Sequence, residues 1–333
     1  MEEGKLFKQL RQARGFTLAH LSDDLNSRSF ISKFETGASN ISLHRLEHLL
    51  GKINVSFEEF LYLRASDQGT THFEHVLYTP MYLTSVFIEQ LDQVLAINKD
   101  ANLSVESMQR GIRQITALKK EIADKQGSTF ILLYADFIQH TFKVNLEANV
   151  AQTQTEAQTQ REHFFETYRI RTRPVVSYLL KVDDWGVYEV LLFRYFQFLF
   201  PIETSHRLLK TAISRTQKES GLAVMREVQL DLLFSTFSTF INFRHFEWAK
   251  EALDLAEEIL FDRGDLMNSA NLLCYQGWYW YILGDIEKGI QKFDQGLSVF
   301  RILKQPKQVS LWEMMLKSVK KNALDPNRYL VFR

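Results

Sequence analysis

Residues 17–36, TLAHLSDDLNSRSFISKFET, combine two short apolar segments with a polar turn between them. Leu18 and Leu21 lie at helical spacing in the first segment, and Ile31 and Phe34 do so in the second. The pair Asn26 and Ser27 interrupts the apolar pattern between them, and both residue types favour turns and helix starts. The stretch therefore predicts a helix, a tight turn and a second helix.

The same kind of pattern continues on both sides of this stretch. Gly15 and Gly37 interrupt it before and after, and Ser42 starts another apolar run. Ser56 and Glu59 have the spacing of a capping box, which marks the start of a helix. Residues 1–65 are therefore expected to form a domain of five helices, at about 4–14, 17–24, 28–36, 42–52 and 56–65.

The composition of the whole chain favours an all-α protein. Its 333 residues are 45% hydrophobic and 24% charged, and 40 Lys and Arg balance 40 Asp and Glu. The 14 glycines and 5 prolines are too few for the many turns of a β-sandwich or barrel. We predict a first domain at 1–65, a linker at 66–80 and a second, mostly helical domain at 81–333.

An internal repeat indicates stacked helix pairs in this second domain. Four places recur after 40 residues with apolar or small side chains: Phe246 and Ile286, Ala249 and Gly289, Leu253 and Phe293, Ala256 and Gly296. Small residues suit the points where two helices cross closely. One helix pair cannot bury its own apolar face, so several stacked copies are implied.

This repeat resembles a tetratricopeptide repeat. Five residues fall at the small and aromatic positions of that motif: Gly277, Trp280, Gly289, Phe293 and Gly296. The match is good over 266–303 and fair over 228–263. Earlier helix pairs, near 81–145 and 164–215, follow from the helical pattern alone, and an irregular helical domain is the alternative there.

The first domain resembles the Xre/Cro-type helix-turn-helix. In that motif the second helix enters the major groove of DNA, and its N-terminal residues meet base edges. Residues 15–17 open the scaffold helix, and residues 31–37, ISKFETG, match the signature I-S-x-x-E-x-G of the family. The resemblance implies double-stranded promoter DNA as a partner.

A narrower resemblance is to the Rgg/GadR/MutR regulators of Gram-positive bacteria. It rests on residues 27–35, 40–46 and 54–60, and more loosely on the segment DWGVYE at 184–189. It implies transcriptional control by a short signalling peptide that binds the helical-repeat domain, as in quorum sensing. The alternative is a tetratricopeptide-like scaffold that acts by protein–protein binding without sequence-specific DNA readout.

Charge and helical position single out the candidate DNA contacts. Arg28, Ser29 and Lys33 share one face of the third helix, and an arginine can grip guanine with two hydrogen bonds. Polar residues at helix starts can hold phosphates, with helix capping as an alternative and compatible role. These residues are Thr17, Ser27, Asn40 and Ser42.

Two further expectations concern the first domain and the state of assembly. The Xre-type resemblance implies an ion pair between Arg11 and Glu35 that joins the first and third helices. Residues 1–65 hold nine Lys and Arg against eight Asp and Glu, so the domain has a weak positive field. A homodimer would double the phosphate contacts. The apolar tail YLVF at 329–332 would cap the last repeat or pack on a second subunit.

The first helix of each stacked pair is expected to line a concave face, which suits a peptide ligand. Seven residues on two such helices are the candidate peptide contacts: Asn271, Tyr275, Trp278, Asp231, Phe234, Ser238 and Asn242. An asparagine offers a donor and an acceptor to a peptide backbone, and aromatic walls suit apolar side chains. The expected ligand is a short hydrophobic peptide. The alternative is that the aromatics fill the interior of the repeat.

Other functions find little support in the sequence. We find no phosphate-binding, metalloprotease or hydrolase motif and expect neither an enzyme nor a cofactor. We expect no metal site at His72, Glu74 and His75, and an inert thiol at Cys274, either in the core or in the groove. We recognise no signal peptide, and the apolar stretch 187–201 is too short to span a bilayer. A cytoplasmic protein without membrane contact is expected.

Overall fold

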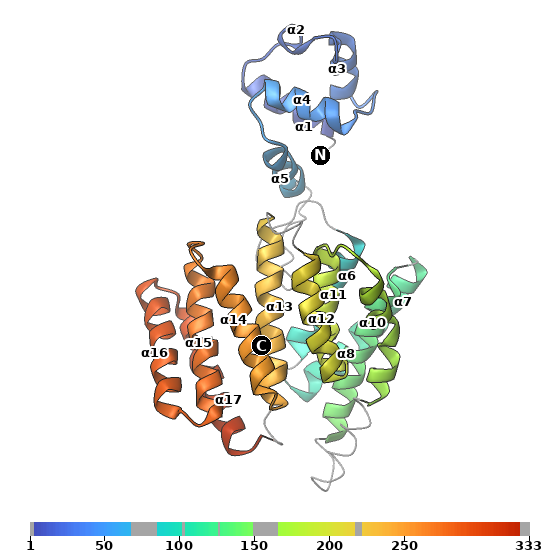
Figure 1. The fold of residues 1–333 in the computed structure, drawn as a ribbon. Helices are drawn as coiled ribbons and strands as arrows, with labels where there is room; N and C mark the ends of the chain where they lie inside the picture. Colours follow the sequence, from blue (N-terminus) through green and yellow to red (C-terminus); the bar gives the residue numbers. More distant parts are fainter. Residues whose placement is uncertain are drawn as a thin grey trace. The chain divides into compact units, whose positions relative to one another are not determined.

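The computed structural model describes residues 3–67, 85–101, 104–125, 127–148, 166–216 and 222–326, and within these ranges every regular element is a helix (Figure 1). The predicted all-α fold is confirmed. The chain divides into two compact units, Met1–Asp92 and Gln93–Arg333. Most of the predicted linker, the three residues His72, Glu74 and His75, and the apolar tail at 329–332 lie outside the described residues.

The first unit contains the five helices expected from the sequence. They are α1 (Glu3–Ala13), α2 (Leu18–Leu21), α3 (Arg28–Glu35), α4 (Leu43–Lys52) and α5 (Phe57–Asp67). Only α2 is clearly shorter than predicted. The carboxylate of Asp23 accepts the backbone N–H groups of Leu25 and Asn26 at 3.0 and 2.8 Å, which closes a turn directly after this helix.

One apolar core holds the first unit together. Its members come from all five helices and the turn after α4: Leu6, Phe7, Leu21, Ile31, Phe34, Leu46, Leu49, Leu50, Ile53, Val55 and Phe60. The rings of Phe7 and Phe34 lie 5.8 Å apart, so α1 and α3 are in direct contact. A Cβ atom on Gly4 would lie only 1.9 Å from the carbonyl oxygen of Phe34, so this contact requires glycine.

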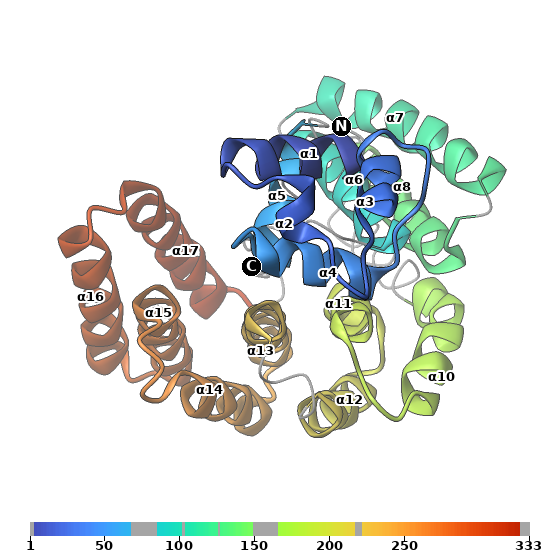
Figure 2. The same cartoon turned by 90° about the horizontal axis from the view of Figure 1, so that it is seen from above.

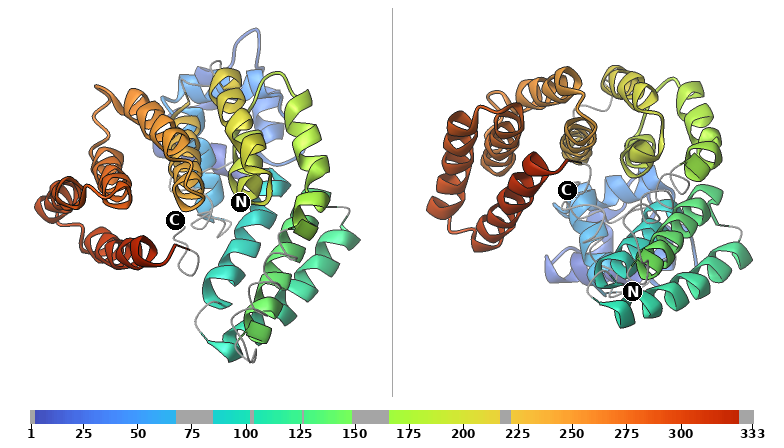
Figure 3. Two further views of the ribbon diagram at one scale, coloured as in Figure 1. Left: turned by 60° about the horizontal axis from the view of Figure 1, so that its bottom comes forward. Right: turned by 90° about the horizontal axis from the view of Figure 1, so that it is seen from below.

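The second unit is built from antiparallel helix pairs. After α6 (Val86–Ala101), which spans the boundary between the units, follow α7 (Val105–Asp124), α8 (Thr129–Ala148), α10 (Arg173–Lys181), α11 (Val187–Phe196), the 3₁₀ helix η1 (Gln197–Leu199), α12 (Ile202–Arg215), α13 (Ala223–Asn242), α14 (Phe246–Leu260), α15 (Leu266–Leu283), α16 (Ile286–Ile302) and α17 (Pro306–Leu324). Seen along the helix axes, α10, α12, α14 and α16 form an outer layer, and α11, α13 and α15 lie inside it (Figures 2 and 3).

The predicted repeat corresponds to the pairs α13–α14 and α15–α16. In the second pair the glycines allow backbone contact between the helices. A Cβ atom on Gly289 would lie 2.8 Å from the backbone nitrogen of Tyr281, and one on Gly296 would lie 2.4 Å from Sγ of Cys274. Cys274 is fully buried at this crossing. The equivalent of Gly289 in the first pair is Ala249, which is also fully buried.

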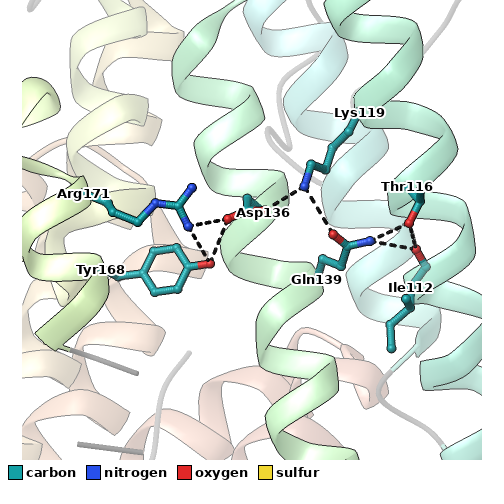
Figure 4. A network of polar contacts seen from close by, with 7 residues as sticks. All are labelled: Ile112, Thr116, Lys119, Asp136, Gln139, Tyr168 and Arg171. Carbon is teal, nitrogen blue, oxygen red and sulfur yellow. Dashed lines mark hydrogen bonds and ion pairs between the residues drawn. The ribbon is translucent and has the colours of Figure 1, made fainter. Parts of the chain in front are cut away.

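A polar network joins α7, α8 and the helical segment 166–171 (Figure 4). Asp136 on α8 accepts hydrogen bonds from Nζ of Lys119 at 2.7 Å and from Nη1 of Arg171 at 2.5 Å. Burial alone would raise the pKa of Asp136, but the hydrogen bonds and charges of these two cations outweigh it and lower the pKa. Gln139 extends the network to Thr116 on α7. In the part of the chain that the structure describes, no helix is long and apolar enough to cross a membrane.

We predict that Gly289→Ala lowers the stability of the second unit. The added methyl group meets backbone atoms, which cannot move aside as a flexible side chain would, and overpacking of this kind costs about 1–3 kcal/mol. Thermal unfolding followed by circular dichroism measures the effect. Gly51→Ala is the control, because that helical glycine has open space around its Cβ position, and the change should be neutral or stabilising. Equal melting temperatures for Gly289→Ala and wild type would contradict the close crossing.

We predict that Asp136→Asn lowers the free energy of unfolding by about 1–3 kcal/mol at pH 7, because Lys119 and Arg171 lose their charged acceptor. The folded-state pKa of Asp136 lies below its unfolded value of about 4, so the stabilisation is full above that pH. It is lost as the pH falls through the folded-state pKa. Urea unfolding at pH 7 and pH 3 should therefore show a difference from wild type that shrinks in acid.

The exposed Asp124 on α7 provides the matched control, since Asp124→Asn removes the same charge outside the network. A pH-independent difference for Asp136→Asn would show that the lost carboxylate acts through packing and not through its charge.

Candidate functional site

The helix α3 presents a polar face to solvent. Its N-cap residue Ser27 accepts the backbone N–H of Phe30 at 3.2 Å, which fixes where the helix begins. The three residues expected to meet bases, Arg28, Ser29 and Lys33, are all exposed, whereas Ile31 and Phe34 of the same helix face the core. The structure therefore brings these three polar side chains together on one accessible helix.

The four residues predicted at helix starts behave differently. Thr17 accepts the backbone N–H of His20 at 3.3 Å and caps α2, as Ser27 caps α3. Ser42 stands at the N-cap position of α4 but makes no capping hydrogen bond with its side chain. Asn40 is exposed in the preceding loop. Capping thus accounts for two of the four residues, and Asn40 and Ser42 have exposed polar groups that no cap uses.

The ion pair between Arg11 and Glu35 is present and buried. Nε of Arg11 lies 2.6 Å from Oε1 of Glu35, and Nη2 lies 2.8 Å from Oε2. The remaining amine, Nη1, donates to the backbone carbonyl of Phe16 at 2.7 Å. The hydrogen bond to Glu35 raises the pKa of Arg11 despite the opposing effect of burial. The pair thus ties α1 and α3 to the loop that leads into α2.

We predict that Glu35→Ala lowers the free energy of unfolding of the first unit by about 3–5 kcal/mol, because it leaves a buried guanidinium without its counterion. The double variant Arg11→Met with Glu35→Leu is the control. Replacing both charges by apolar groups of similar volume is often close to neutral, so it should cost much less. Denaturant unfolding checks both variants. A double variant as unstable as Glu35→Ala would show that the loss comes from packing.

A second polar centre, at Asp23, was not predicted from the sequence. Its Oδ2 atom lies 2.5 Å from Nζ of Lys52 and 2.6 Å from Nε2 of His48, both on α4. The hydrogen bond from Lys52 and then that with His48 lower the pKa of Asp23 well below its usual range. Asp23 therefore connects the turn between α2 and α3 to α4. His48 and Lys52 follow Asp23 by 25 and 29 residues in the sequence, so no local motif signals these contacts.

The seven residues predicted to bind a peptide lie on α13 and α15, and most of them are packed against one another. The rings of Phe234 and Tyr275 stack at 4.4 Å. Trp312 from α17 donates through Nε1 to Oδ1 of Asn271 at 2.9 Å and packs edge-on against Tyr275 at 4.9 Å. Asn242 is buried and donates to the carbonyl of Ser238 at 2.7 Å.

The prediction that Trp278 forms the wall of an open groove is therefore corrected. Its side chain is fully buried, with the ring of Phe237 edge-on at 5.3 Å, so it fills the interior between α13 and α15. Asn271, Tyr275, Phe234, Ser238 and Asn242 are also buried. The physical reason lies partly in α17, which packs along α15 and contributes Trp312 and Asn322 to this face.

Asp231 is the predicted groove residue that remains accessible, with 39% of its side chain exposed. Its Oδ2 atom accepts from Nε of Arg194 on α11 at 2.6 Å. The guanidinium of Arg194 also lies 4.6 Å from the ring centre of Tyr195. Burial would lower the pKa of Arg194, but the charge of Asp231 outweighs this effect and raises it. The pair places a strong donor and acceptor between the inner helices α11 and α13.

Comparison with protein families matches both units. Residues 7–60 match a helix-turn-helix model, and residues 134–314 match the model described as HTH-type transcriptional regulator Rgg, C-terminal domain. The protein is thus a helix-turn-helix transcriptional regulator and not a scaffold or an enzyme. Because the second match covers more than half of the chain, the protein belongs to the Rgg family.

Solved structures share this fold over nearly the whole chain. The SHP pheromone receptor Rgg2 of Streptococcus dysgalactiae is 19% identical with a TM-score of 0.63, over 95% of this chain and 99% of that one. A protein from Listeria monocytogenes EGD-e is 18% identical with a TM-score of 0.72, over 96% and 98%. ComR from S. thermophilus, solved with DNA and its signalling peptide ComS, is 14% identical with a TM-score of 0.50, over 97% and 99%.

Proposed function

We propose that the protein is a cytoplasmic, homodimeric regulator that reads double-stranded promoter DNA with α3 and binds a short apolar peptide with its helical-repeat unit. The observation that carries the DNA part is the exposed face of α3. Arg28, Ser29 and Lys33 project from a helix whose start is fixed by Ser27 and whose position is fixed by the buried Arg11–Glu35 pair. A rigid helix with free polar side chains suits base readout in the major groove.

Phosphate contacts would come from the loop and helix start that follow α3. Asn40 and Ser42 are exposed there, and the side chain of Ser42 does not cap its own helix. Thr17 and Ser27 use their hydroxyl oxygens as caps but can still donate to phosphate oxygens. Because residues 1–65 carry a net charge of only +1, two copies bound to spaced half-sites would supply the electrostatic attraction that one copy lacks.

The peptide-binding part of the proposal rests on two solved structures of similar fold and on the accessible ion pair of Asp231 and Arg194. Rgg2 is described as a pheromone receptor, and ComR was solved with its signalling peptide. In this chain, Asp231 and Arg194 offer an acceptor and a donor on the inner helices. Only Oδ2 of Asp231 is engaged by Arg194, so Oδ1 can accept from the N–H groups of a peptide backbone. We place the centre of the peptide site at this pair, toward α11, and not at Trp278.

We predict that Arg28→Ala strongly lowers the preference for the operator while the melting temperature stays unchanged, because Arg28 is exposed and makes no contact with the core. A randomised duplex pool selected on the wild type supplies the operator. Fluorescence anisotropy then compares that operator with a scrambled duplex for both proteins. An arginine that makes two hydrogen bonds to a base contributes about 1–3 kcal/mol to the preference for the right base over a wrong one, and the variant loses this contribution. Undiminished preference for the operator would overturn the assignment of α3 as the reading helix.

We predict that Asp231→Asn weakens peptide binding about tenfold, since it removes a charged acceptor while keeping an oxygen for Arg194. Calorimetry with short apolar peptides selected on the wild type from a synthetic library measures the affinity. Asp254→Asn on α14 is the control, because it removes the same charge from an exposed pair with Lys250. Trp278→Ala should instead lower the free energy of unfolding by about 3–5 kcal/mol. Peptide affinity of Asp231→Asn equal to wild type would move the site elsewhere.

A further inference from the structure

The arginines of the first unit fall into two groups. Arg11, Arg14 and Arg64 each form a salt bridge with a glutamate of the same unit: Glu35, Glu59 and Glu3. Arg28 and Arg45 have no acidic partner within the described residues. Arg28 is exposed to solvent, as expected for a residue that reads bases, but Arg45 is half-buried. A half-buried cation without a carboxylate requires another explanation.

The ring of Phe30 supplies the contact that Arg45 has instead. Arg45 lies in the first turn of α4, and its guanidinium carbon is 4.7 Å from the centre of the Phe30 ring on α3. Such a cation–π contact contributes about 0.5–1 kcal/mol near a surface. A salt bridge would use the N–H groups of the guanidinium, and within the described residues those of Arg45 meet no carboxylate.

We propose that Arg45 binds a phosphate of the DNA backbone and that Phe30 is the positioning residue that holds its guanidinium ready for this contact. The contact holds the guanidinium over the ring, and its N–H donors meet no acceptor within the described residues, so they are available for two-point binding of a phosphate. Phe30 directly follows Arg28 and Ser29 on α3, so Arg45 is anchored to the same helix that exposes the residues proposed to read bases. This assignment rests on the proposed DNA-binding function.

The roles of Arg45 and Arg28 differ in what they contribute. A phosphate contact carries no direct sequence information, so Arg45 should strengthen binding to every duplex alike. It should also add to the salt dependence, because each neutralised phosphate releases condensed counterions. Arg28, in contrast, should affect mainly the preference for the operator. Sequence preference and salt slope therefore separate the two roles.

The test is fluorescence anisotropy of the full chain with the selected operator and with a scrambled duplex of equal length, over a series of KCl concentrations. Arg45→Ala should lower the affinity for both duplexes about tenfold at low salt. It should also reduce the slope of log affinity against log salt by about one for each DNA-binding domain. Arg14→Ala is the matched control: it removes the same charge from an exposed arginine already paired with Glu59, and its slope should stay close to wild type.

Variants of Phe30 test the positioning role. Phe30→Leu keeps an apolar side chain but removes the aromatic face, so it should lose part of the affinity that Arg45→Ala loses. Phe30→Tyr keeps the aromatic face and should keep the DNA affinity of the wild type. Arg45→Lys keeps the charge but not the planar fork, and should fall between wild type and Arg45→Ala. Melting temperatures close to wild type for Arg45→Lys and Phe30→Tyr show that their affinities report on DNA contacts and not on unfolding.

The outcomes separate this inference from the function on which it rests. If Arg28→Ala loses operator preference while Arg45→Ala keeps the wild-type affinity and salt slope, Arg45 is not a phosphate contact and only this inference fails. Equal affinities of Phe30→Leu and wild type would remove Phe30 as the positioning residue. A wild type that binds neither duplex would overturn the proposed DNA-binding function and this inference together.

Discussion

The second unit depends on the burial of α13. From Leu232 to Asn242 every residue of this helix is buried, so over this stretch the helix has no side that faces water. A helix of this kind must be enclosed, and its neighbours are α11, η1 and α12 on one part of its surface and α14 and α15 on another. The helix α13 thus lies between α11 and α15 among the inner helices, and it is also the first helix of the repeat that α13–α14 and α15–α16 form. Removing any of these neighbours would expose apolar surface on α13.

Enclosure of α13 also dictates how its polar residues are satisfied. Thr236 donates to the carbonyl of Leu232 at 2.7 Å, and Ser238 donates to that of Phe234 at 2.9 Å, so both hydroxyls return to their own helix. Gln197 of η1 donates to Oγ1 of Thr239 at 2.9 Å. Small hydroxyl side chains therefore let a fully enclosed helix pack closely without leaving their donors unpaired, which would cost about 1–3 kcal/mol each.

Signals that are local in sequence predicted most of the fold. The helix-turn-helix and the α13–α16 repeat follow from apolar spacing, turn residues and small residues at fixed intervals, all of which act within about 40 residues. Two side-chain contacts within the first unit left no such signal. The short α2 depends on the turn at Asp23, which α4 holds through Lys52, and the anchoring of Arg45 depends on a ring on another helix. No sequence motif pairs Asp23 with Lys52 or Arg45 with Phe30, so only the three-dimensional arrangement shows these contacts.

The candidate peptide residues show what a chemical pattern on a helix can and cannot determine. Asparagines beside aromatic rings on α13 and α15 predicted a surface that accepts polar and apolar contacts from a partner. The structure contains such a partner within the chain, namely α17. Trp312 of this helix donates a hydrogen bond to Asn271, and its Asn322 donates one to Asn242 at 3.4 Å. The side-chain oxygen of an asparagine accepts a hydrogen bond from the N–H of an indole as well as from that of a peptide backbone. The pattern therefore marks a face that needs covering, and Asp231 is the predicted residue of this face whose side chain stays accessible.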